Sequence, residues 1–112
     1  MLMMSIFSQL GKIRAFEQKY LPHLVTREDC DIVRIIGLHH ERMKPLLLKQ
    51  LFLEGISSFS TVSRRLKRLR ELGYVLVDSP GLDRRSILLS LSPQVLKTYL
   101  RYGALLKTLA AS

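Results

Sequence analysis

The feature that most constrains the fold is a change of apolar pattern at Gly73. Before this glycine, apolar residues recur at three- and four-residue steps, which is the spacing of amphipathic helices. After it come two short runs of strand-forming residues, 74–78 and 86–91, separated by turn-forming residues at 79–83. Because a two-stranded hairpin is only marginally stable in water, we expect this hairpin to pack against the helices.

Start and stop signals divide the rest of the chain into helices. Glu28 and Asp29 lie two and three residues after Thr26, which predicts a capped helix start, and Ser92-Pro93 predicts another. Pro45 suits the first turn of a short helix. The predicted helices are 3–20, 27–42, 46–53, 60–72 and one from 93 onward. The order of elements predicts a mainly α chain with a small β-hairpin (α+β class), arranged as a winged helix-turn-helix with extra N- and C-terminal helices.

The length of 112 residues suits one domain with one core. We expect residues 26–92 to form the winged core of a single domain 1–112, with an N-terminal helix within 1–24 and a C-terminal helix within 93–112. The two terminal helices carry apolar stripes that a core of this size cannot cover. The sequence therefore predicts a homodimer joined through them, with packing of the two helices on each other within one chain as the alternative.

Positive charge is concentrated in one region. The chain has 18 Lys and Arg against 9 Asp and Glu, a formal net charge of +9. Residues 60–85 hold seven of the basic and three of the acidic residues. Such an excess favours a polyanionic partner. The alternative is that the charge only keeps the protein soluble.

The helix predicted at 60–72 has two different faces. On a wheel of about 100° per residue, Leu66 and Leu69 lie within about 40° of Val62 and define a buried side. Small hydroxyl side chains begin the opposite side and cations continue it. The candidate DNA-binding residues on and beside this face are Ser60, Thr61, Ser63, Arg64, Lys67 and Arg68.

This layout suits insertion into the major groove of double-stranded DNA. Short Ser and Thr side chains let the helix approach the base edges, and Arg64 is long enough to bind a guanine edge with two hydrogen bonds. We expect Arg65, Arg68 and Arg70 to contact the phosphate backbone instead. An ordinary solvated basic helix remains the alternative.

The turn of the predicted hairpin adds Asp83, Arg84 and Arg85. An arginine at a narrow tip can enter a minor groove, where the negative potential attracts it. Asp83 can orient one guanidinium through paired hydrogen bonds. The alternative is a charged turn without a binding role.

Residues 83–92, together with residues 60–73, resemble the wing and the recognition helix of the MarR family of transcriptional regulators. The resemblance covers residues 26–92. It implies a homodimer whose subunits each contact half of a palindromic site, and a small-molecule effector is possible. Ser60, Thr61, Ser63 and Arg64 then match DNA-contacting helix positions. Arg85 matches the wing arginine and Asp83 its partner.

Other chemistry is poorly supported by the sequence. No glycine-rich phosphate loop, no nucleophile elbow and no paired carboxylates in an apolar setting occur, so we expect no enzyme and no cofactor. His39 and His40 are adjacent on a helix and diverge by about 100°, so we expect no metal site.

Cys30 is the only cysteine and is expected in or near the core. It permits no internal disulfide, and no membrane-length apolar run occurs, so we expect a cytoplasmic protein.

The sequence thus predicts a sequence-specific DNA-binding regulator. Two alternatives stay open. One is a winged-helix adaptor for an acidic protein partner, and the other is a non-specific architectural or RNA-binding protein.

Overall fold

A computed structural model describes residues 5–79 and 86–111 of the chain. It confirms a mainly helical fold with a small antiparallel sheet. The elements are α1 (Ile6–Tyr20), α2 (Arg27–Glu41), β1 (Leu46–Leu47), α3 (Leu48–Phe52), α4 (Phe59–Glu71), β2 (Val75–Asp78), β3 (Leu88–Leu91) and α5 (Pro93–Ala111).

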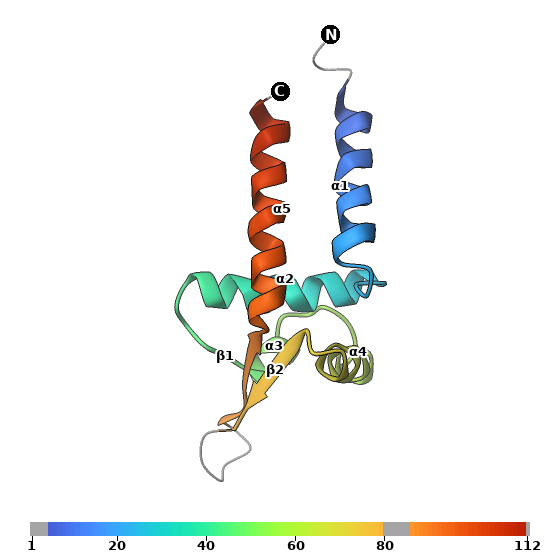
Figure 1. The fold of residues 1–112 in the computed structure, drawn as a ribbon. Helices are drawn as coiled ribbons and strands as arrows, with labels where there is room; N and C mark the ends of the chain where they lie inside the picture. The colour runs from blue at the N-terminus through green and yellow to red at the C-terminus, as the bar shows by residue number, and fades with distance from the viewer. Residues whose placement is uncertain (1–4, 80–85, 112) are drawn as a thin grey trace.

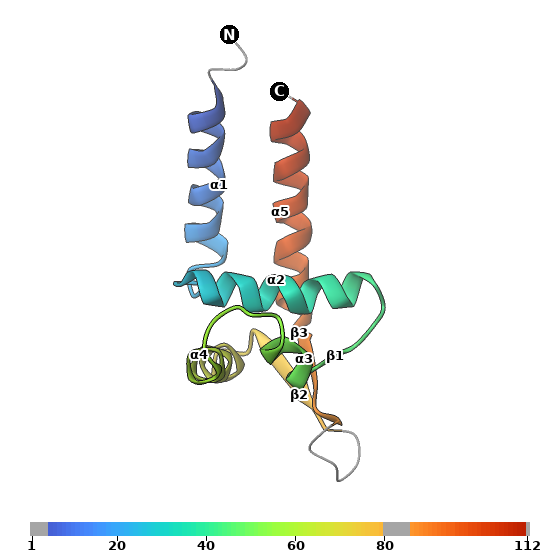
Figure 2. The ribbon, with the colours of Figure 1, turned by 180° about the vertical axis from the view of Figure 1, so that it is seen from behind.

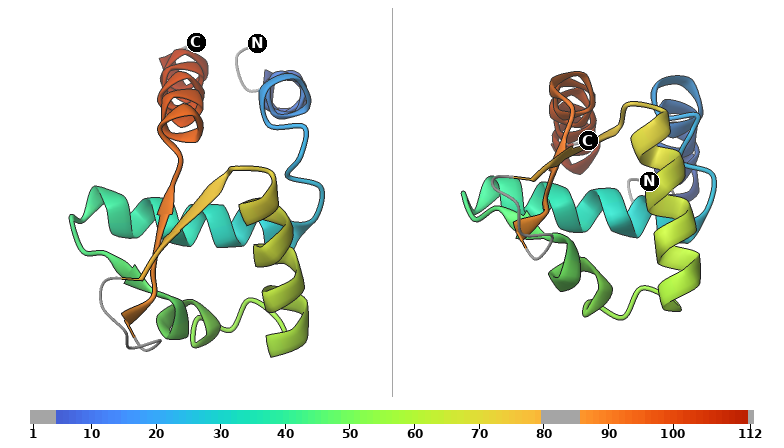
Figure 3. Two further views of the ribbon diagram at one scale, coloured as in Figure 1. Left: turned by 60° about the horizontal axis from the view of Figure 1, so that its bottom comes forward. Right: turned by 90° about the horizontal axis from the view of Figure 1, so that it is seen from below.

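The elements form two parts (Figures 1 and 2). Helices α1 and α5 stand side by side, with the start of α1 and the end of α5 away from α2, which lies across their base. On the other side of α2 are α3, α4 and the sheet, with α4 beside the strands (Figure 3). The molecule is elongated, with extents of 58 × 27 × 23 Å. Helices α2, α3 and α4 followed by β2 and β3 form a winged helix-turn-helix, as predicted.

The sheet has one strand more than the sequence predicted. Its order is β1-β3-β2, both pairs are antiparallel, and Leu46 pairs with Leu89 while Val75 pairs with Leu91. We predicted a helix from Leu46, but residues 46–47 are extended. The second edge of β3 supplies backbone partners for this segment, and Leu46 is buried there. Tertiary pairing therefore overrides the helical pattern of its leucines.

One apolar core joins α2, α4 and the sheet. Helix α2 contributes four aliphatic side chains, α4 contributes three, and the strands close the other side. The buried members are Ile32, Val33, Ile35, Ile36, Leu46, Leu51, Val62, Leu66, Leu69, Val75, Leu89, Leu91 and Val95. Burial of this continuous cluster holds α4 in place and leaves its outer face uncovered.

The first turn of α2 contains a reciprocal cap. Thr26 Oγ1 accepts a hydrogen bond from the Asp29 backbone N–H at 3.1 Å, and Asp29 Oδ2 accepts one from the Thr26 backbone N–H at 3.1 Å. The predicted cap is thus confirmed. Asp29 points inward, so the next residue, Cys30, is turned outward and is exposed. The prediction that Cys30 lies in or near the core is wrong.

The two terminal helices contact each other within the chain. Tyr102 on α5 donates its hydroxyl to Glu17 Oε2 on α1 at 2.8 Å, and its ring lies 5.1 Å from that of Phe16. Gln9 Nε2 donates to the Leu109 carbonyl at 3.0 Å. This contact covers only part of the apolar stripes. The side chains that stay exposed on α1 and α5 include Ile6, Phe7, Leu10, Leu100 and Leu106.

Two leucines at the end of α3 provide a test of the core. Leu51 is fully buried, whereas Leu53 is 78% exposed. We expect Leu51→Ala to lower the free energy of unfolding by about 2–5 kcal/mol, because it removes buried methyl groups and leaves a cavity. We expect the matched control Leu53→Ala to change it by less than about 0.5 kcal/mol. Urea denaturation measures both, and equal losses would contradict this placement of α3.

Candidate nucleic-acid interface

Helix α4 has well-defined ends. Its N-cap is Ser58, whose Oγ accepts a hydrogen bond from the Thr61 backbone N–H at 3.2 Å. The helix therefore starts at Phe59, one residue before the predicted start. After α4, Gly73 has a φ of 79°, a left-handed conformation that glycine adopts without strain. The chain then turns directly into β2.

The outer face of α4 is hydroxylic at its start and cationic along its length. Val62, Leu66 and Leu69 are buried against α2 and the sheet. Of the predicted DNA-binding residues, Thr61 and Arg68 are half-buried. The exposed ones are Ser60, Ser63, Arg64 and Lys67. Within residues 5–79 and 86–111, no acidic side chain forms an ion pair with Arg64 or Lys67, so their charges face solvent.

The inner edge of α4 is tied to α2 by an ion pair that the sequence analysis missed. Asp29 is fully buried, and its carboxylate accepts two hydrogen bonds from Arg65, including one from Nε at 2.7 Å. The same carboxylate accepts backbone hydrogen bonds from Val25 and Thr26. One side chain thus joins the α1–α2 loop, the start of α2 and the middle of α4.

Arg68 extends this network toward the α1–α2 loop. Its Nη1 donates to the His23 carbonyl at 2.7 Å and lies 3.5 Å from Asp29 Oδ2. Its guanidinium is therefore held at the side of α4. The predicted contact of Arg68 with phosphate stays a prediction. Arg68 would have to make it while keeping its bonds to His23 and Asp29.

Arg65 requires a correction, because we predicted that it contacts the DNA backbone. The structure places its guanidinium inside, against Asp29. On the helical wheel Arg65 lies about 60° from Val62, nearer to the buried side than Arg64 does. That angle is the sequence signal that could have placed the Arg65 side chain toward the core. The wheel could not identify Asp29 as its ion-pair partner, because Asp29 is 36 residues away in the chain.

The environment of Asp29 determines its charge. Burial alone raises the pKa of this carboxyl group, but the hydrogen bonds from Arg65 and from the Thr26 and Val25 backbones outweigh that effect. The net result is a pKa below the ordinary value. Asp29 is therefore ionised at neutral pH and balances Arg65.

The predicted wing residues Asp83, Arg84 and Arg85 lie outside the described residues, so their placement stays a prediction. Strands β2 and β3, which flank them in sequence, are described. In Figure 1 the ends of these strands lie on the same side of α2 as α4, away from α1 and α5.

Known structures share this arrangement. NadR, solved in complex with 4-hydroxyphenylacetate, is similar with a TM-score of 0.59 and 20% identity, over 89% of this chain and 71% of NadR. MarR has a TM-score of 0.50 and 24% identity, over 90% and 77%. A MarR-family transcriptional regulator from Silicibacter pomeroyi has a TM-score of 0.54 and 21% identity, over 96% and 69%. The chain has the MarR-type winged-helix fold. Comparisons with protein-family models and with curated protein sequences give no match.

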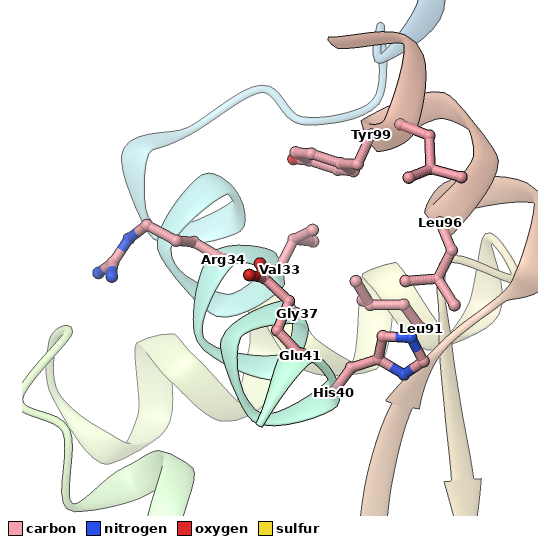
Figure 4. A pocket seen from close by; sticks show the side chains of 9 residues that line it. Val33, Arg34, Gly37, His40, Glu41, Leu91, Leu96 and Tyr99 are labelled. Atoms are coloured by element: carbon pink, nitrogen blue, oxygen red, sulfur yellow. The ribbon is translucent and has the colours of Figure 1, made fainter. Parts of the chain in front are cut away.

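The MarR-type fold of this chain contains a cavity of about 330 Å³ between α2 and α5. In Figure 4 the Tyr99 ring and Leu96 from α5 face Val33 and Gly37 from α2, while the Arg34 guanidinium points away. The lining is mainly apolar. Burial raises the pKa of the Tyr99 hydroxyl, which is therefore neutral at physiological pH and able to donate a hydrogen bond.

Metal sites and membrane-spanning helices were also sought among the described residues. In the part of the chain that the structure describes, no three His, Cys, Asp or Glu side chains come together to hold a metal ion. None of the described helices combines the length and the apolar character needed to span a membrane.

The Asp29–Arg65 pair predicts a specific acid sensitivity. Because the pKa of Asp29 is lower in the folded chain than in the unfolded chain, its contribution to stability is present above about pH 4 and is lost as the pH falls further. We expect Asp29→Asn to be less stable than the natural chain at pH 7, since it leaves the Arg65 charge without its partner. Urea denaturation from about pH 7 to about pH 3 should show the difference shrinking as the pH falls. A difference that stays constant would exclude a lowered pKa of Asp29.

Proposed function

We propose that this protein is a sequence-specific DNA-binding transcriptional regulator that acts as a homodimer. The observation that carries the proposal is the outer face of α4, where Arg64 and Lys67 are exposed and make no ion pair with any described residue, next to exposed hydroxyl groups. Such a face has the charge and the small side chains that a major groove accepts. The MarR-type fold supports the proposal, because it uses this helix position as a recognition helix.

Each part of the face has a separate role in this proposal. Ser60 and Ser63 allow close approach and contact bases or phosphates, and Arg64 reads a guanine edge. Lys67, and Arg68 beside its internal bonds, contact phosphates. Arg84 and Arg85 enter the adjacent minor groove with Asp83 orienting one guanidinium. The resulting binding is strong at low salt and becomes selective through a few base contacts.

Homodimerisation is proposed from the exposed apolar side chains of α1 and α5. Phe7 is 80% exposed, and Ile6, Leu10 and Leu100 are exposed in the same part of the molecule. Burial of such a surface in a symmetric contact removes its cost in water. A two-fold dimer would present two α4 helices to a palindromic site.

Two other functions would use the outer face of α4 differently. An adaptor for an acidic protein would use the same cations but would bind no DNA at low salt. An architectural or RNA-binding protein would bind with a steep salt dependence but without sequence preference. The ordered hydroxyl and arginine pattern of α4 favours sequence recognition over both. A regulator of this kind acts in the cytoplasm, where it reaches DNA.

The cavity between α2 and α5 is the proposed place for a small-molecule effector. Its volume is within the range of ligand sites, and its mainly apolar lining, with Tyr99, His40 and Glu41 among its polar residues, suits a small, largely apolar compound with a few polar groups. A ligand there would touch both α5 and the helix on which α4 packs. It could therefore change the spacing of the two recognition helices in a dimer.

Arg64 is the sharpest test of sequence recognition. After selection of bound sequences from random duplex DNA, we expect Arg64→Ala to weaken binding to the selected site by about 10-fold or more, because a two-bond base contact is lost. Binding to random DNA should weaken much less. The matched control is Lys107→Ala, which removes an exposed cation from α5, far from α4 along the chain.

Gel-shift titrations at one salt concentration measure both variants on both DNAs. Equal losses for Arg64→Ala on selected and random DNA would contradict a base contact by Arg64. Absence of DNA binding by the natural chain at low salt would exclude the proposed function and favour the adaptor.

Phe7 tests the proposed dimer. We expect Phe7→Glu to shift the protein from dimer to monomer, since it places a charge in an apolar contact. Leu53→Glu puts the same charge on an equally exposed leucine in the α3–α4 part, and it should leave the dimer intact. Sedimentation velocity distinguishes the two masses. A monomeric natural chain, or a dimer insensitive to Phe7→Glu, would overturn this interface.

A further inference from the structure

An exposed aromatic side chain lies at the start of the recognition helix. Phe59 is the first residue of α4 and is 67% exposed. Its ring packs on that of Phe52 from α3, with a centroid distance of 4.4 Å and an interplanar angle of 31°. Phe59 falls between the helices predicted at 46–53 and 60–72, and no role was predicted for it.

The contact with Phe52 holds one side of the Phe59 ring and leaves the other side in solvent. A phenylalanine has only two side-chain torsions, and the supporting ring restricts them further, so little entropy is lost when it binds. The helix start is also fixed, because Ser58 caps it through the Thr61 backbone. Phe59 is therefore a preorganised apolar group on a rigid element.

The position of Phe59 determines what it can meet. In a helix-turn-helix the N-terminal residues of the recognition helix contact base edges in the major groove. Phe59 directly precedes Ser60 and lies one turn before Ser63, about 40° from it around α4, and both serines are exposed. Its ring therefore lies at the edge of the proposed DNA-binding face, next to Ser63. A phenyl ring forms no conventional hydrogen bond to a base edge, and the apolar group that the major groove offers is the thymine 5-methyl group.

We propose that Phe59 is a specificity-determining residue that contacts a thymine 5-methyl group in each half of the DNA site. This inference rests on the proposed function and adds to it the chemistry of one base position. Arg64 reads a guanine edge through hydrogen bonds, whereas Phe59 reads an A·T pair through the apolar surface of its thymine.

The test removes the methyl group without changing base pairing. In the selected DNA site, each thymine is replaced in turn by deoxyuridine, which lacks only the 5-methyl group. We expect one position in each half-site at which the natural chain loses about fourfold in affinity per methyl group. We expect Phe59→Ala to bind the thymine and deoxyuridine sites equally well, because the ring that senses the methyl group is gone.

Two further variants separate this contact from general damage. Phe59→Leu keeps an apolar side chain and should retain part of the sensitivity to the methyl group. Leu53→Ala removes a neighbouring exposed apolar side chain and should retain all of it. Circular dichroism verifies that each variant is folded, and Phe59→Leu still tests the contact if Phe59→Ala does not fold.

The outcomes are distinct. If the natural chain binds no DNA, the proposed function fails and this inference fails with it. If it binds DNA selectively but no deoxyuridine substitution weakens binding, or if Phe59→Ala keeps the full sensitivity, only the role of Phe59 is overturned.

Discussion

One buried carboxylate ties the proposed recognition helix to α2 and to the loop before it. The two oxygens of Asp29 accept hydrogen bonds from the backbone of the α1–α2 loop and from Arg65 in the middle of α4. A buried charge is tolerated only when it is paired and its oxygens are hydrogen-bonded, and both conditions are met here. Burial of Val62, Leu66 and Leu69 sets which face of α4 turns inward. The pair between Asp29 and Arg65 adds a directional contact that favours the same rotation, with Arg64 outward.

The same pair accounts for a division among the arginines of α4. Arg64 and Arg65 are neighbours in sequence but differ by about 100° around the helix. That difference leaves Arg64 in solvent and turns Arg65 toward a carboxylate on another helix. Counting positive charges in the sequence could not separate the two roles. Fewer positive charges on α4 are therefore available to a nucleic acid than the number of Lys and Arg residues suggests, and the available ones lie on its outer face.

Much of the fold could be predicted, because local signals and the global arrangement agree. The periodicity of α2 and α4, the cap at Thr26 and the change of pattern at Gly73 are local features, and each is found in the structure. The parts that were missed depend on distant partners. Strand β1 exists because β3 offers it a second edge, and Arg65 is internal because of a residue 36 positions away. Phe59 was missed for another reason, since an apolar residue between two predicted helices gives no periodic signal.

Helix α2 lies between the α1–α5 end of the molecule and α4 (Figures 1 and 2). The exposed side chains of α1 and α5 combine large apolar groups with Lys and Arg, whereas those of α4 combine cations with two serines and Phe59. Helix α2 contributes to the core under α4, carries Asp29 and lines the cavity against α5. A change at the α1–α5 end that tilts α2 would therefore move α4 with it, because the Asp29–Arg65 pair and the shared core join the two helices as one body. In a homodimer such a tilt would alter the spacing of the two recognition helices without altering either recognition surface.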